Sequence, residues 1–142
     1  MADTIAAIST APGEGGIGIV RVSGPQSLSL MKRLKFACPE EIEPRHAYFG
    51  KVVKDSSDKN ARVIDEGIFL YMKAPASYTG EDMLEIQAHG SNVSLRAILA
   101  AVLDSGRHGG QRVGQGGQAM SYVQTTRLEK IGRPKSVKKP YK

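Results

Sequence analysis

Two charged residues stand out because each lies in a mostly apolar, strand-like run. Arg21 is the only charge in the run 17–23, and Glu85 is the only charge in the run 83–88. Charged side chains are seldom buried without a partner. A guanidinium suits carboxylates or carbonyl oxygens, and one carboxylate can accept from an amine and a ring N–H together. We therefore treat Arg21 and Glu85 as candidate ligand-binding residues.

Both residues could also have purely structural roles, and the sequence does not decide between these roles and ligand binding. Arg21 could cover a sheet edge or pair with a surface acid, and Glu85 could lie on a solvated strand face. Strand alternation places Met83, Glu85 and Gln87 on one side and the apolar residues between them on the other. The sequence thus predicts the face that carries Glu85, but it leaves the partner of Arg21 undecided.

Three further features are weaker indications of a functional site. Hydroxyls in the loop 77–82 could line a pocket or cap a turn, and we expect His89 to be a hydrogen-bonded turn residue. Cys38 is expected to be a small filler or an inert thiol. The sequence has no suggestive nucleophile–base pair and no metal-ligand spacing, so we predict neither catalytic nor metal-binding residues.

The glycines of the loop 13–18 match a dinucleotide fingerprint in form only. That fingerprint must open a helix whose N-terminus meets a pyrophosphate, whereas here the glycines run into a β-branched strand. The chain also lacks a G-x-x-x-x-G-K-[ST] phosphate loop. We interpret the segment as a tight loop between strands, one that allows a ligand or another backbone to approach closely.

Composition divides the chain into two parts. Its 142 residues suit one domain, predicted over 1–106. The excess of basic over acidic residues lies in the Gly/Gln/Lys-rich tail 107–142, which is predicted to be mostly disordered. The chain shows no apolar run long enough for a bilayer and no signal-peptide pattern, and its single cysteine excludes an internal disulfide. We therefore expect a cytoplasmic protein without a membrane partner.

The elements needed to position Arg21 and Glu85 follow from the apolar periodicity. Two helices and five strands are expected, with Ser23 as a possible cap for the first helix. Because several strands come in hairpins, the fold class is α+β, with a mixed, largely antiparallel sheet of about five strands and two or three helices packed on it. The expected strands are 3–9, 17–23, 45–53, 62–73 and 83–88, and the expected helices are 25–36 and 92–105.

Three blocks within residues 3–106 resemble the N-terminal domain of the MnmE (TrmE) family of tRNA-modification GTPases. They are DTIAAISTAPGEGGIGIVRVSGP, DEGIFLYMKAPASYTGEDMLEIQAHGS and NVSLRAILAAVLDSG. The resemblance implies a fold like the folate-binding domain of aminomethyltransferases. It also implies that the domain forms a homodimer and binds a reduced folate, 5-formyl- or 5,10-methylene-tetrahydrofolate. It also implies that Arg21 and Glu85 occupy positions that contact the folate.

The same resemblance implies partners for the family as a whole. The folate carbon enters the wobble uridine of certain tRNAs in a carboxymethylaminomethyl-type modification, together with a flavoprotein of the MnmG (GidA) type. A separate G domain, with K⁺ and Mg²⁺, hydrolyses GTP. Beyond Gly106 the family continues with a segment that carries a further folate-contacting lysine, and we find no match to that segment in 107–142.

Three functions stay open at this point. The first is a folate-binding and dimerisation module, present as a truncated chain that has no G domain and no catalytic activity of its own. The second is a small RNA-binding protein acting through its basic tail, although only Tyr122 and Tyr141 there offer stacking surfaces. The third is a non-functional remnant.

Overall fold

The structure, a computed structural model, describes residues 4–11, 13, 15–108 and 113–115. These residues form six strands and two helices. In chain order they are β1 (Thr4–Ile8), β2 (Gly15–Ser23), α1 (Ser27–Leu34), β3 (Ala47–Val53), β4 (Val63–Met72), β5 (Met83–Gly90), α2 (Asn92–His108) and β6 (Val113–Gln115).

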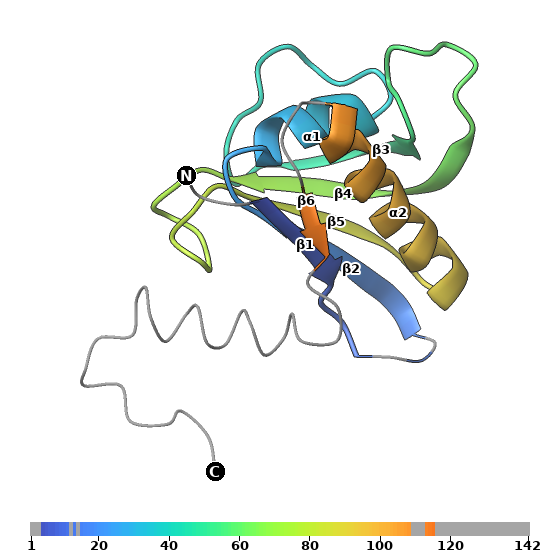
Figure 1. Ribbon diagram of the computed structural model, residues 1–142, viewed down its shortest axis with the longest axis horizontal. Helices are drawn as coiled ribbons and strands as arrows, with labels where there is room; N and C mark the ends of the chain where they lie inside the picture. Colours follow the sequence, from blue (N-terminus) through green and yellow to red (C-terminus); the bar gives the residue numbers. More distant parts are fainter. Residues whose placement is uncertain (1–3, 12, 14, 109–112, 116–142) are drawn as a thin grey trace.

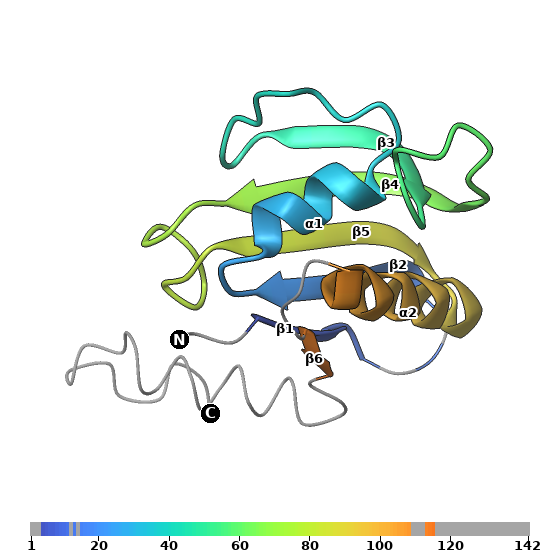
Figure 2. The ribbon, with the colours of Figure 1, turned by 45° about the horizontal axis from the view of Figure 1, so that its top comes forward.

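All six strands belong to one sheet in the order β3-β4-β5-β2-β1-β6. Neighbouring strands are antiparallel except β1 and β6, which pair in parallel. Both helices lie against the same face of the sheet, α1 and α2 side by side (Figures 1 and 2). The predicted α+β class, with a mixed and largely antiparallel sheet, is confirmed.

The hydrophobic core fills the space between the two helices and this face of the sheet. Helix α1 contributes Leu30, Met31 and Leu34, all almost fully buried. Alternate strand residues meet the helices, because successive side chains on a strand point to opposite faces. Burying one large apolar side chain contributes about 1.5–3 kcal/mol, so this layer is the main source of stability. The strand residues of the core include Val20, Val22, Val52, Phe69, Tyr71, Leu84, Ile86 and Ala88.

Gly18 explains part of the glycine-rich loop seen in the sequence. A Cβ at this position would overlap the side chain of Leu95 on α2, which is buried. The absence of a side chain at Gly18 therefore lets α2 lie directly on β2. The glycine at this position serves helix–sheet packing.

Several expected boundaries differ from the structure. Helix α1 covers only Ser27–Leu34, and Ser23 does not cap it, because its hydroxyl bonds Thr79 and Glu81 on a distant loop instead. Helix α2 continues to His108, and strand β6 was not expected at all. The disorder predicted for the tail, together with Tyr122 and Tyr141, concerns residues outside the described ranges, apart from the short stretches in α2 and β6.

Candidate functional site

The sheet has a second face, opposite the helices, which we call the open face because no described helix lies on it. Its side chains alternate with those of the core along β2, β4 and β5. Polar groups from β5 and one cation from β2 lie among aliphatic side chains there. By register, the open face includes Ile17, Ile19, Arg21, Ile68, Leu70, Glu85, Gln87 and His89.

Arg21 and Glu85 form an ion pair near the centre of the open face. They are direct cross-strand partners in the β2–β5 ladder, and Arg21 Nε lies 2.7 Å from Glu85 Oε1. The side chain of Glu85 is only 5% exposed, whereas that of Arg21 is 22% exposed. The partner that the sequence left undecided is therefore Glu85, and the two candidate ligand-binding residues are brought together.

The second oxygen of Glu85 also accepts a hydrogen bond. Gln87 Nε2 donates to Glu85 Oε2 at 3.3 Å, from the same face of β5. This bond is longer than the typical 2.9–3.0 Å, roughly, of an N–H···O bond. A stronger donor arriving from the open face would therefore compete with Gln87 rather than with Arg21.

Apolar side chains border the ion pair. Ile19, Ile68 and Leu70 are partly buried, and Ile17 is largely exposed. Leu70 pairs with Glu85 across β4 and β5, so the charged pair lies directly beside this aliphatic surface. Aliphatic surface around a few fixed polar groups is the usual composition of a small-molecule site.

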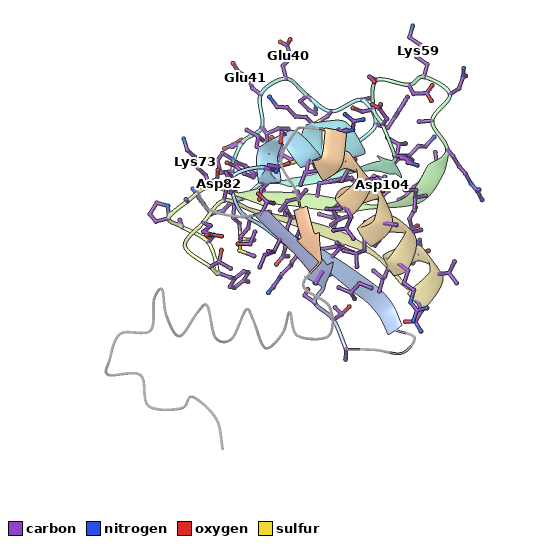
Figure 3. All side chains as sticks on the ribbon, viewed as in Figure 1. Glu40, Glu41, Lys59, Lys73, Asp82 and Asp104 are labelled. Carbon is purple, nitrogen blue, oxygen red and sulfur yellow. The ribbon has the colours of Figure 1, made fainter. Side chains whose placement is uncertain are left out.

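The loop 74–82 borders the open face at the end where β4 finishes and β5 begins. Figure 3 labels Lys73 just before the loop and Asp82 at its end. Tyr78, within the loop, lies over Arg21, with 4.6 Å from the Arg21 Cζ to the ring centroid. Sequence reasoning named this loop for its hydroxyls and missed the aromatic contact, because strand patterns carry no signal for the position of a loop side chain.

His89 pairs with an acid that sequence reasoning did not name. Its Nδ1 lies 2.7 Å from Asp65 Oδ1, and its backbone N–H donates to Asp65 Oδ2. Burial raises the pKa of Asp65, but hydrogen bonds from the His89 ring and from the backbone N–H groups of Glu66 and His89 outweigh it, so the pKa lies below its usual value. His89 is thus a hydrogen-bonded residue at a strand end.

Cys38 is partly buried and packs against the hydrophobic core. Burial raises the pKa of its thiol, and the nearby charges of Lys35 and Lys32 offset this only in part. A thiolate is the reactive form of cysteine, so a raised pKa makes Cys38 a poor nucleophile. Among the described residues, no group of three or more His, Cys, Asp or Glu side chains is arranged to hold a metal ion.

A cavity of about 360 Å³ lies on the helix side, between the α1 end, the β3–β4 turn and the last turns of α2. Arg33, Asp104 and Ser105 are among its lining residues, and Asp104 is labelled on α2 in Figure 3. None of the open-face residues lines it. This cavity is therefore separate from the Arg21–Glu85 pair.

Fold and site together define an α+β domain whose open sheet face carries a partly buried ion pair. The family model described as "GTP-binding protein TrmE N-terminus" matches residues 4–119. The chain therefore belongs to this TrmE N-terminal family. The match extends past Gly106, and the domain boundary expected there stays a prediction.

Curated relatives agree with the family model. The "tRNA modification GTPase MnmE" of Janthinobacterium sp. (strain Marseille) is 46% identical over 114 residues, which cover 80% of this chain and 24% of the relative. The protein of the same name from Myxococcus xanthus is 46% identical over 73% of this chain and 23% of its own length. That of Chromohalobacter salexigens is 50% identical over 69% and 20%. The chain thus spans about a quarter of the length of these relatives and corresponds to the N-terminal module of a tRNA-modification GTPase.

In the part of the chain that the structure describes, no helix is both long enough and apolar enough to cross a bilayer.

Proposed function

We propose that the open face binds a reduced folate, 5-formyl- or 5,10-methylene-tetrahydrofolate, at the Arg21–Glu85 pair. The observation that carries the proposal is a carboxylate only 5% exposed, held 2.7 Å from a guanidinium on a sheet face that no described helix covers. A carboxylate fixed in this way can accept from the amine and a ring N–H of a pterin, while the guanidinium attracts its carbonyl oxygen. The aliphatic residues beside the pair would contact the rest of the ligand.

The role of the chain follows from the family. We propose that it acts as the folate-binding and dimerisation module of a tRNA wobble-uridine modification GTPase, in the cytoplasm. A second copy of the chain, tRNA and an MnmG (GidA)-type flavoprotein are the proposed partners. GTP hydrolysis, with its K⁺ and Mg²⁺, belongs in this proposal to the part of the relatives that the chain does not match.

Isothermal titration calorimetry with 5-formyltetrahydrofolate tests the folate site. Glu85→Gln keeps the size of the side chain but removes its charge, and Arg21→Ala removes the guanidinium. Losing a hydrogen bond to a charged group costs about 1.5–3 kcal/mol, so each change should weaken binding about 10- to 100-fold. Glu41→Gln, on the exposed loop labelled in Figure 3, is the matched control and should bind like the wild type.

Two results would contradict the proposal in different ways. No heat of binding with the wild-type chain would contradict folate binding itself. Wild-type binding that neither Arg21→Ala nor Glu85→Gln weakens would place the folate elsewhere, and the ion pair would then have only a structural role.

A further inference from the structure

Tyr78 is an exposed aromatic residue beside the ion pair. Its ring centroid lies 4.6 Å from Arg21 Cζ, which is within the range of a cation–π contact. Tyr78 is nevertheless 55% exposed, whereas the carboxylate that pairs with the guanidinium is almost fully buried. Much of the Tyr78 side chain therefore remains available to a molecule that arrives at Arg21 and Glu85.

Hydrogen bonds fix the loop that carries Tyr78. On one side, Ser23 Oγ lies 2.8 Å from Thr79 Oγ1 and donates to Glu81 Oε2 at 2.8 Å. Ser23 and Thr79 are both almost fully buried, so this hydroxyl contact is shielded from water. The residues on the C-terminal side of Tyr78 are thus attached to the end of β2, two positions from Arg21.

The end of the same loop is attached as well. Asp82 Oδ1 accepts from the backbone N–H of Ala74 at 2.8 Å, which closes the base of the loop. The carbonyl of Asp82 accepts from Ser27 Oγ at 2.9 Å and from the N–H of Gly24 at 2.8 Å. These hydrogen bonds join the two ends of the loop to each other and join its second half to β2 and α1. They therefore hold Tyr78 in a fixed position over the sheet.

We propose that Tyr78 is a stacking residue of the folate site and confers its preference for a planar heterocycle. This inference rests on the proposed function. A ring that hydrogen-bonds to Glu85 and to the edge of the Arg21 guanidinium lies next to the guanidinium that Tyr78 covers. The part of the Tyr78 ring that the guanidinium leaves uncovered would then contact the heterocycle, and such aromatic contacts add to affinity beyond the area they bury.

A purely structural role for Tyr78 predicts different behaviour. If the ring only shields Arg21, its removal would change the stability of the domain and leave the environment of the bound heterocycle unchanged. A stacking role changes the ultraviolet absorption of the bound heterocycle, because stacking alters its electronic environment. The absorption of the bound ligand therefore separates the two roles.

The experiment measures calorimetric affinity for 5-formyltetrahydrofolate and the ligand difference spectrum at saturation. Tyr78→Phe keeps the ring and should bind within about twofold of the wild type. Tyr78→Ala should bind about five- to tenfold more weakly and should lose the stacking difference spectrum. Tyr78→Leu, which keeps apolar bulk without a ring, should lose the spectrum too. Phe36→Ala, an exposed aromatic after α1, is the control and should change neither quantity.

The outcomes separate this inference from the proposed function. If wild-type chain shows no binding, the folate proposal fails and the stacking role fails with it. If the wild type binds and Arg21→Ala weakens binding while Tyr78→Ala keeps both affinity and spectrum, the folate site stands and the stacking role alone is overturned. Circular dichroism of each variant checks that a loss of binding does not come from unfolding.

Discussion

Arg21 and Glu85 are separated by 63 residues in the chain and are direct partners across β2 and β5, with 2.7 Å between Nε and Oε1. The pair links β2, which forms a hairpin with β1, to β5, which forms a hairpin with β4, and β2 and β5 are neighbours within the sheet. Its two members are unequally shielded, because Glu85 is nearly buried and Arg21 is partly exposed. This difference decides what each substitution should do to stability.

Arg21→Met should destabilise the domain more than Glu85→Leu. The first change leaves a buried carboxylate without its guanidinium, which costs about 3–5 kcal/mol, whereas the second leaves a cation that solvent can reach. The double variant should be more stable than Arg21→Met alone. Urea unfolding of all four proteins gives the coupling energy, and strictly additive losses would show that the pair is not coupled.

Gly67→Ala should be strongly destabilising. A Cβ at Gly67 would overlap the backbone carbonyl of Gln87 on β5, so the two strands would have to separate. We expect a loss of about 3 kcal/mol, at the upper end of the usual cost of overpacking. Gly16→Ala is the matched control, since a Cβ there meets no described atom within 4 Å. Thermal unfolding compares them, and equal melting temperatures would contradict this account of Gly67.

The Asp65–His89 contact should give stability a pH dependence in the acid range. The pKa of Asp65 lies below its usual value in the folded protein, so the stabilisation is present above the unfolded pKa of about 3.9 and is lost as the pH falls through the folded pKa. Asp65→Asn should therefore cost about 1 kcal/mol near pH 6 and progressively less below pH 4. Urea unfolding at pH 6, 4 and 3 measures this. A constant difference across that range would mean that Asp65 does not titrate as described.

Cys38 should react slowly with thiol reagents. Burial raises the pKa of its thiol, so less thiolate is present at pH 8 than for an ordinary cysteine. Labelling with Ellman's reagent should be at least severalfold slower in the folded protein than in urea. Because the chain has one cysteine, the absorbance reports this residue alone. Equal rates in both states would show that the thiol is fully accessible.

The fold was largely predictable because its strands carry a strong alternation. Along β5, the pattern placed Glu85 and Gln87 together on one side, and the structure confirms this with a hydrogen bond between them. The identity of the Arg21 partner was not predictable from the residues, since it depends on the register between β2 and β5. Alternation indicates a face of a strand and carries no information about which strand lies beside it.

Two other features, the partners of the Ser23 hydroxyl and strand β6, could not be predicted from the sequence. Ser23 looks like a helix cap because it precedes Gly24-Pro25, yet its hydroxyl bonds Thr79 and Glu81, more than fifty residues away. Strand β6 has only three residues, Val113–Gln115, among glycines and glutamines. A segment of that length shows no periodicity and becomes a strand only because β1 offers it a partner.

The pairing of β1 with β6 has a consequence for how the chain reaches its fold. Thr4 lies opposite Val113, so the outer edge of β1 is covered only when a segment more than 100 residues further along the chain pairs with it. Until then the backbone groups along that edge can pair with another chain. Contacts between residues so far apart along the sequence also slow folding. Strand β1 can therefore pair wrongly with another chain until residues 113–115 have folded back onto it.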